Sequence, residues 1–153
     1  MQEFISKSEK ETKELARNIA SKLTNGDIIV LEGDLGAGKT KFTEGFLSFW
    51  GLEKEISSPT FTIVNQYTNK NITINHFDVY RLEDIDEFYA IGGTEYFDNG
   101  ICIIEWGELI EDILPKDYIK ITIKKSEEDY NTRKIEIQTK SEKTKNKIRE
   151  ILQ

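Results

Sequence analysis

Residues 33–40 read GDLGAGKT and constrain the fold more than any other stretch of the chain. They fit the pattern G-x-x-x-x-G-K-[ST], in which a glycine-rich loop holds phosphate groups. An apolar run at residues 27–32 comes directly before the loop, and residues 39–50 repeat apolar side chains at helical spacing. Strand, loop and helix in this order are the context that the pattern requires. The sequence therefore predicts an α/β fold built around a phosphate-binding loop.

The residue types in the loop suit an anion. Gly33, Gly36 and Gly38 allow positive φ angles and let backbone N–H groups approach a phosphate. A helix beginning near Lys39 adds its unpaired N–H groups and the positive end of its dipole. Lys39 supplies a mobile charge, and the Thr40 hydroxyl is a hard oxygen ligand of the kind that Mg²⁺ prefers. A chance match is expected only ~0.005 times in a chain of this length, so we interpret the loop as functional.

The chain has 153 residues and a formal net charge of −7. This length predicts one domain, residues 1–153, with a core large enough to be stable without cross-links. The negative charge disfavours a large nucleic-acid footprint, which requires a clustered basic surface. Cys102 is the one cysteine, so an intrachain disulfide is excluded and its apolar surroundings predict a buried thiol. Because no stretch has membrane-spanning length and the N-terminus lacks the apolar core of a signal peptide, we expect a cytoplasmic protein.

Alternating helical and strand-like patterns predict the rest of the fold. We expect helices at residues 6–23, capped by Ser6 or Ser8, at 83–91, and in a charged tail at 141–153. We expect strands at residues 61–67, 71–77, 100–104, 118–123 and 133–137, with the first two and the last two forming hairpins. The predicted class is a P-loop NTPase-like three-layer sandwich, with a mixed, mostly parallel central sheet, β-hairpin additions and flanking helices. Four lysines are interpreted as protection of a sheet edge: Lys116, Lys120, Lys124 and Lys125.

Two acidic residues stand where predicted strands end, which is where ligands collect in open α/β sheets. Asp78 could orient the water or metal that phosphoryl transfer needs, or it could cap a helix or pair with Arg81. Glu105 follows an apolar run typical of a central strand and is a second candidate ligand for Mg²⁺; the alternative is a surface acid. Trp106 either packs or lies against bound nucleotide. Thr60 follows a proline, which fixes the backbone, and could reach a metal-bound phosphate, although an ordinary turn is the simpler interpretation.

Four segments occur in the order and compact spacing of a known family: GDLGAGKT at residues 33–40, SPTF at 58–61, HFDVYRL at 76–82 and IEW at 104–106. Over residues 6–137 the chain resembles the TsaE (YjeE) family, the small bacterial P-loop ATPases of tRNA threonylcarbamoyladenosine biosynthesis. The resemblance implies slow hydrolysis of Mg-ATP and docking on the TsaD and TsaB proteins, which transfer the threonylcarbamoyl group to the adenosine beside the anticodon. It implies contact with tRNA only through these partners.

The resemblance also implies roles for individual residues. Lys39, Asp78 and Glu105 form the catalytic set, with Asp78 acting on water. Thr40 and Glu105 bind Mg²⁺, and Thr60 corresponds to a switch-like threonine. The expected nucleotide contacts are Thr12, Gly33, Asp34, Leu35, Gly36, Ala37, Gly38, Lys39, Thr40, Lys41, Thr60, Trp106 and Arg133, with Thr12 near the base. Family members usually have proline after the Glu-Trp pair, whereas this chain has Gly107, a departure that concerns the rigidity of the segment after Trp106.

Three other functions compete with this interpretation. A small-molecule kinase would need an acceptor pocket and usually a lid with several arginines, and this chain has only four scattered ones: Arg17, Arg81, Arg133 and Arg149. A GTPase would usually carry an N-K-x-D-type segment that reads guanine, and the sequence has none. A nucleotide-dependent assembly module would bind ATP and barely hydrolyse it. Because no arginine finger is evident, we expect slow intrinsic turnover that a partner accelerates.

Overall fold

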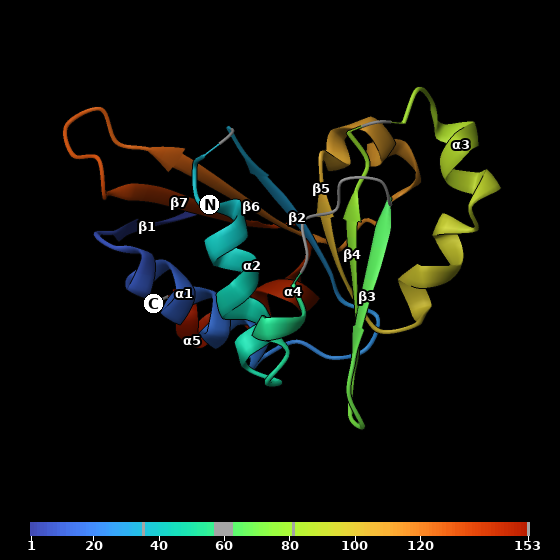
Figure 1. The fold of residues 1–153 in the computed structure, drawn as a ribbon, viewed down its shortest axis with the longest axis horizontal. Helices are drawn as coiled ribbons and strands as arrows, with labels where there is room; N and C mark the ends of the chain where they lie inside the picture. The colour runs from blue at the N-terminus through green and yellow to red at the C-terminus, as the bar shows by residue number, and fades with distance from the viewer. Residues whose placement is uncertain (35, 57–62, 81, 153) are drawn as a thin grey trace.

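The computed structural model describes residues 1–34, 36–56, 63–80 and 82–152 (Figure 1). Its described strands form one seven-stranded sheet in the order β1-β7-β6-β2-β5-β4-β3. The strands are β1 (Gln2–Ser6), β2 (Ile28–Gly33), β3 (Val64–Thr68), β4 (Thr73–Asp78), β5 (Ile101–Glu105), β6 (Ile119–Lys125) and β7 (Arg133–Thr139). The helices are α1 (Glu9–Ala20), α2 (Lys39–Ser48), α3 (Ile85–Ala90), α4 (Glu142–Lys147) and α5 (Arg149–Leu152), with 3₁₀ turns η1 (Glu53–Glu55), η2 (Gly93–Asp98) and η3 (Gly107–Ile113).

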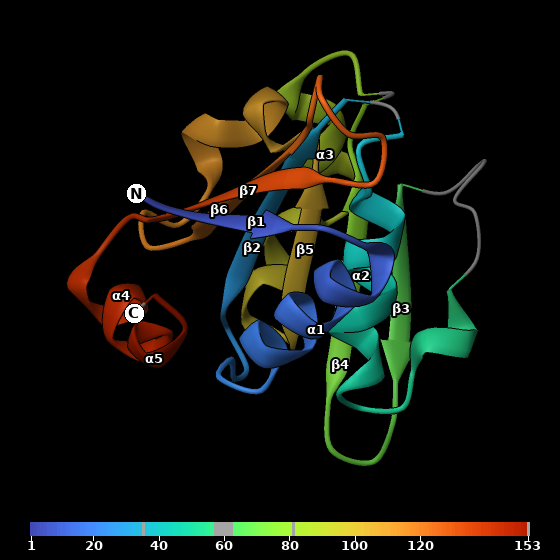
Figure 2. The ribbon, with the colours of Figure 1, turned by 90° about the vertical axis from the view of Figure 1, so that its left-hand side faces the viewer.

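The middle of the sheet is parallel and its two sides are antiparallel. Strand β2 pairs in parallel with both β5 and β6, and β4 pairs in parallel with β5. The β3–β4 hairpin adds one side, and β7 and β1 add the other in antiparallel register. Figure 2 shows β1, β7 and β6 running side by side across the sheet. The mixed sheet with hairpin additions confirms the predicted fold class.

Helices cover both faces of the sheet because its central strands are apolar on both sides. In β5, Ile101 and Ile103 face a core that includes Phe42 and Phe46 of α2. The alternate residues of that strand, with Ile104 among them, face a second core that α3, η2 and η3 cover. Two cores on opposite faces of one sheet make the three layers that the sequence predicts.

The segments around the phosphate loop agree with prediction apart from their ends. Helix α1 begins at Glu9 with Ser8 as its N-cap, so the expected start at residue 6 is wrong. Ser6 instead ends β1, a strand that the sequence analysis missed. Helix α2 ends at Ser48, two residues before the predicted end. The tail is helical as predicted, and Ile148 is fully buried in the core under α1 and α2.

The interpretation of the lysines as edge protection is wrong, because the edge strands of the sheet are β1 and β3. Strand β6 lies inside the sheet, between β2 and β7. Two of its lysines pair with acids on neighbouring strands: Lys120 lies 3.4 Å from Glu32, and Lys124 lies 3.0 Å from Glu136. The prediction failed because β6 pairs with β2 on one side and with β7 on the other, so neither of its edges is free.

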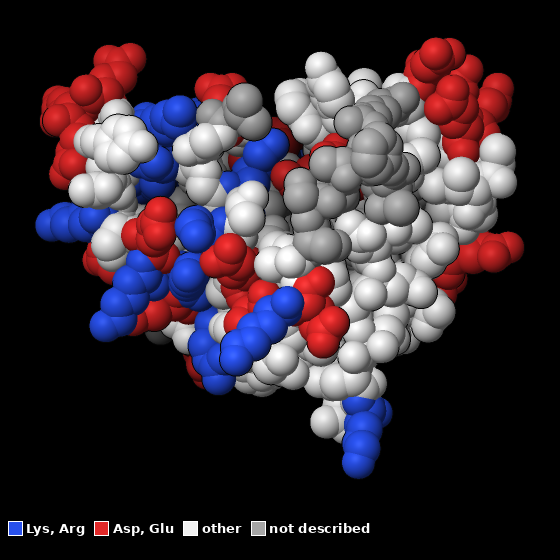
Figure 3. All heavy atoms as spheres, viewed as in Figure 1, with Lys and Arg blue, Asp and Glu red and all other residues white. Residues whose placement is uncertain are grey.

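Charges are distributed unevenly over the surface. Figure 3 shows basic side chains gathered over the half that contains α1 and β7, where acidic side chains are interspersed with them. The opposite end, around α3, exposes the acidic residues Glu83, Asp84 and Asp86. None of the described helices combines the length and the apolar character that crossing a bilayer requires.

Candidate functional site

The glycine-rich loop connects β2 to α2, as the sequence predicts. Gly33 ends β2 so close to β6 that a Cβ atom would lie 2.7 Å from the carbonyl oxygen of Ile123, so a larger residue would displace the strand. Gly38 is the N-cap of α2 and has a φ of 115°, in the region that favours glycine. The first N–H groups of α2 therefore point into the loop without a capping side chain, which is the arrangement that binds anions.

The two predicted acids lie side by side. Asp78 at the end of β4 is the register partner of Glu105 at the end of β5, and Glu105 in turn pairs with Leu31 of β2. These strands are parallel, so their carboxyl ends meet at the same edge of the sheet as the loop. The Asp78 Oδ1 atom accepts a hydrogen bond of 3.1 Å from the backbone N–H of Tyr80. Of the two alternative roles of Asp78, the helix cap is wrong, because Asp84 caps α3. Pairing with Arg81 stays a prediction, since Arg81 lies outside the described residues.

Glu105 is held between two nitrogen-bearing side chains. Its Oε1 atom lies 3.6 Å from Lys39 Nζ, and its Oε2 atom lies 2.6 Å from His76 Nε2. The Glu105 side chain is 15% exposed, so the surface-acid alternative is wrong. Burial alone would raise the pKa of this carboxyl, but the hydrogen bond with His76 and the electrostatic attraction of His76 and Lys39 lower it below its usual value. The site therefore keeps an ionised carboxylate in a mostly enclosed position.

Trp106 lies at the mouth of the site in an unusual backbone conformation. Its φ is 64° and its ψ is 32°, a left-handed geometry that non-glycine residues rarely adopt. The indole lies 5.0 Å from Lys39 Nζ and 4.8 Å from the ring of Tyr80, measured to ring centroids. The next residue, Gly107, packs so closely on β2 that a Cβ atom would lie 2.8 Å from Val30 Cγ1. Gly107 thus lets this segment lie closer to β2 than a residue with a Cβ atom could without a shift of Val30.

Most of the predicted residues surround one cavity of about 700 Å³. The predicted residues that line it are Thr12, Gly36, Gly38, Lys39, Thr40, Lys41, Asp78, Glu105, Trp106 and Arg133. Gly33 and Asp34 line an adjoining hollow that shares Lys39 and Trp106 with the cavity. Ala37 is buried beneath the loop. Leu35 and Thr60 lie outside the described residues.

Sequence reasoning missed several residues of the cavity. Tyr80 lies two residues after the end of β4, Tyr130 and Asn131 come from the β6–β7 turn, and Ser8 and Glu9 come from the start of α1. The last four carry no motif, and only the fold brings them to the loop. Lys125 does not line this cavity but lies close to the loop, since its Nζ is 3.2 Å from the point where a Cβ on Gly36 would be. The predicted terminal hairpin was the signal that could have placed Lys125 there. Its neighbour Arg133 was predicted, and the two are register partners across the terminal hairpin.

The oxygen atoms in the cavity fit Mg²⁺ bound together with phosphate. Thr40 and Glu105 both line the cavity and are hard oxygen ligands. Among the described residues there is no group of three or more histidine, cysteine or acidic side chains that could hold a metal by itself. Mg²⁺ commonly takes one or two protein ligands and completes its shell with substrate phosphates and waters, so this donor set suits a metal that arrives with its nucleotide.

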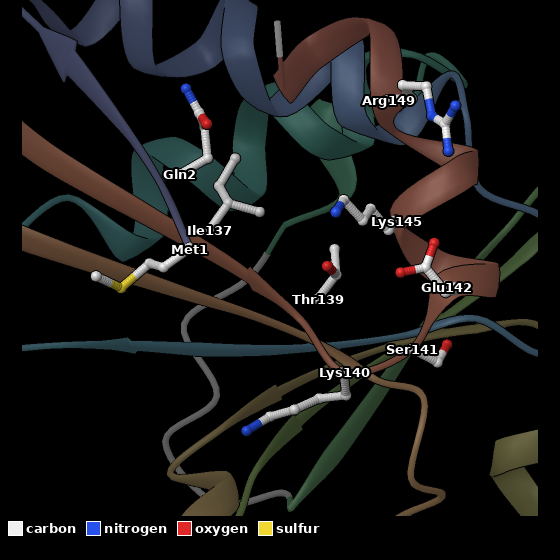
Figure 4. Close-up of a pocket in the computed structure, with 9 residues that line it drawn as sticks. All are labelled: Met1, Gln2, Ile137, Thr139, Lys140, Ser141, Glu142, Lys145 and Arg149. Carbon is white, nitrogen blue, oxygen red and sulfur yellow. The ribbon is translucent and has the colours of Figure 1, made fainter.

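A second hollow lies between β7 and the C-terminal helices, as Figure 4 shows. It measures about 770 Å³ and contains Lys140, Lys145 and Arg149 together with Glu142. None of the predicted site residues lines it. We therefore place the candidate site at the loop and not at this hollow.

A glycine-rich loop between a parallel strand and a helix, with acids at the ends of adjacent parallel strands, defines a P-loop protein of the α/β class. Comparison with known families identifies the group within this class. The family profile of the threonylcarbamoyl adenosine biosynthesis protein TsaE matches residues 6–135. The chain belongs to the TsaE family.

Individual relatives agree with this assignment. The chain is 45% identical over 120 residues to the tRNA threonylcarbamoyladenosine biosynthesis protein TsaE of Bacillus subtilis, covering 78% of this chain and 75% of that protein. It is 39% identical over 127 residues to the protein of the same name in Rickettsia felis, covering 82% and 74% of the two chains. The crystal structure of Bacillus subtilis YdiB superposes with a TM-score of 0.77 and 33% identity, over 97% of this chain and 92% of that chain.

Proposed function

We propose that the protein binds Mg-ATP at the loop and hydrolyses it slowly to ADP and phosphate, as the ATPase component of tRNA threonylcarbamoyladenosine biosynthesis. The observation that carries the proposal is the gathering of Lys39, Asp78 and Glu105 around a cavity that the loop lines. Phosphoryl transfer needs little covalent help, so positioning and charge neutralisation are the main tasks of these residues.

Lys39 supplies the positive charge for the outer phosphates. In the structure its ammonium group lies between the Glu105 carboxylate and the face of Trp106. A triphosphate in the cavity offers a stronger anionic partner than one carboxylate, so Lys39 turns from Glu105 to the phosphates when nucleotide binds. This exchange frees the Oε1 atom of Glu105 at the moment when a metal ligand is needed.

Asp78 orients the attacking water. Its Oδ1 atom is fixed by the Tyr80 N–H, which leaves Oδ2 to accept a hydrogen bond from water. Thr40 and Glu105 would hold Mg²⁺, which would supply Lewis-acid polarisation and neutralise charge on the oxygens of the transferring group. The backbone N–H groups at the start of α2 stabilise the same charge from the other side.

The arginines favour an ATPase over a small-molecule kinase. Of the arginines in the described part of the chain, Arg133 alone lines the cavity, and it is already bonded to the loop backbone through Ala37. Arg17 binds Ser48 at the far end of α2. An arginine-bearing lid is therefore not formed by these side chains, and acceleration of hydrolysis is left to a partner. We propose that the TsaD and TsaB proteins supply it and that hydrolysis supports their turnover.

The surface is compatible with contact to tRNA through those partners. The formal net charge is −7, and basic side chains on the face in Figure 3 alternate with acidic ones. Affinity for nucleic acid comes mainly from unopposed lysines and arginines that replace counterions. A chain with this charge pattern is suited to act on a complex that holds the tRNA.

The proposal is tested by titrating the purified protein with ATP and GTP and by measuring hydrolysis with and without the TsaD–TsaB pair. We expect ATP binding, slow hydrolysis alone and faster hydrolysis in the complex. Lys39→Ala should abolish nucleotide binding or hydrolysis while the protein stays folded. Glu105→Ala should stop turnover; if it still assembles with the partners, binding and hydrolysis are distinct tasks. Unchanged ATP affinity in Lys39→Ala, or equal rates with and without partners, would refute the respective part.

A further inference from the structure

His76 is a buried polar residue that has no place in the mechanism above. It lies on β4 two residues before Asp78 and on the same face of the sheet, with Ile103 of β5 as its register partner. Its side chain is 6% exposed, and it is not among the residues that line the cavity. Nε2 makes a 2.6 Å hydrogen bond to Oε2 of Glu105, while Nδ1 has no hydrogen-bond partner within the described residues.

The two oxygens of Glu105 have different surroundings. Oε2 is bound to His76, on the inner side of the sheet edge. Oε1 is the oxygen that lies near Lys39, which itself lines the cavity. A carboxylate that is pinned through one oxygen presents only the other to a ligand, and its rotation is restricted. The hydrogen bond with His76 therefore determines which oxygen of Glu105 points at the phosphate end of the cavity.

We infer that His76 is a positioning residue, which holds Glu105 so that Oε1 alone is presented to the magnesium ion of the bound nucleotide. This inference rests on the proposed function. Residues that hydrogen-bond a metal ligand fix its orientation, and their loss typically weakens metal affinity even though they touch neither metal nor substrate. Without His76, Glu105 can rotate, and neither of its oxygens is held toward the metal.

Two substitutions of His76 introduce the same amide group but differ in whether that group reaches Glu105. In His76→Gln the side-chain N–H₂ group takes nearly the position of Nε2 and keeps a donor for Glu105. In His76→Asn the same amide is one methylene shorter and falls near the Nδ1 position, out of reach of Glu105. Ile74→Val, on the same strand and face and fully buried, controls for a small change in packing that leaves the hydrogen bond intact.

The measurement is calorimetric titration of each protein with ADP, in the absence and presence of Mg²⁺. The dissociation constant without Mg²⁺, divided by the dissociation constant with Mg²⁺, gives the contribution of the metal to binding. We expect this ratio to fall about 10- to 100-fold in His76→Asn, while His76→Gln and Ile74→Val keep the ratio of the unmodified protein. ADP affinity without Mg²⁺ should stay unchanged in all variants, because the loop and Lys39 are untouched.

Each result of these titrations supports or overturns the positioning role of His76. If His76→Asn keeps the full effect of Mg²⁺, or if it weakens ADP binding equally with and without the metal, the positioning role is overturned. If the unmodified protein binds no ADP at all, the proposed function fails first. Because His76 is the one histidine in the chain, the imidazole ¹⁵N spectrum of the untagged protein reports on it alone. The spectrum should show a hydrogen-bonded Nε2 proton that is lost in Glu105→Ala; an unprotonated Nε2 overturns the inference even if a variant fails to fold.

Discussion

Arg133 Nε donates a hydrogen bond of 2.8 Å to the carbonyl oxygen of Ala37 and thereby joins β7 to the glycine-rich loop. The same guanidinium donates through Nη1 to the carbonyls of Tyr130 and Thr132 at 2.6 and 3.0 Å. One side chain thus shapes both the loop and the turn that faces it across the cavity. Its role in the structure is to orient backbone, which the resemblance to known ATPases did not indicate.

We expect Arg133→Ala to weaken ADP binding about 10-fold. A hydrogen bond to a charged group contributes about 1.5–3 kcal/mol, and partial exposure of Arg133 places the loss at the lower end. Calorimetric titration with Mg-ADP measures the change. Arg17→Ala is the matched control, since Arg17 binds a backbone carbonyl at Ser48, outside the cavity. An affinity loss as large in the control as in Arg133→Ala would refute the specific role of Arg133.

Trp106 should report nucleotide binding by its fluorescence. The indole is 37% exposed, lines the cavity and lies against Lys39, so movement of Lys39 toward phosphate changes its surroundings. The second tryptophan, Trp50, packs against Phe46 and Phe49 beyond the end of α2. Addition of Mg-ADP should therefore change the emission of Trp50→Phe and leave that of Trp106→Phe constant. A response that persists in Trp106→Phe would place the change elsewhere.

Gly45 permits the close contact between α1 and α2. A Cβ atom there would overlap the backbone of Lys13, and a packed helix pair cannot separate without losing core contacts. We expect Gly45→Ala to lower the free energy of unfolding by about 1–3 kcal/mol, measured by urea denaturation. Glu14→Ala, on the exposed side of α1, should change it by no more than about 0.5 kcal/mol. A stability gain in Gly45→Ala, as helix propensity alone predicts, would contradict this packing.

Cys102 makes stability depend on pH in the alkaline range. Burial raises the pKa of this thiol to about 12, from an ordinary value of 9.0. Between these values the unfolded chain has lost the proton that the folded protein keeps, so the folded state loses stability as pH rises, by up to about 1.4 kcal/mol per pH unit. Below about pH 9 the contribution is constant.

The check is urea denaturation at a series of pH values for the protein and for Cys102→Ala. The difference in unfolding free energy between the two should be flat below pH 9.0 and should shrink above it. A native thiol that reacts readily with iodoacetamide at neutral pH would show that Cys102 is not enclosed.

The sequence predicted the parts of the site that local patterns encode. The loop motif, the apolar run of β5 and the acids at two strand ends gave a site in which Asp78 and Glu105 are neighbours, because parallel strands bring their ends to one edge. His76 escaped notice since its partner lies 29 residues away, and only the register of β4 and β5 makes them meet. Strand β1 was missed because it is five residues long and its pairing partner is near the other end of the chain. The role of the lysines of β6 was wrong for a similar reason, because the pairing of β6 with β2 joins segments about 90 residues apart.

Strand β2 is enclosed by β5 and β6 along its two edges and by apolar layers on its two faces. Its amides can exchange with solvent only when the centre of the sheet opens, and they should be among the slowest to do so. The glycine-rich loop and the first turn of α2 follow this strand in the chain. They can adjust to a ligand while β2 itself stays paired. Under the proposed function, release of product and unfolding of the protein are therefore separate events with separate free-energy costs.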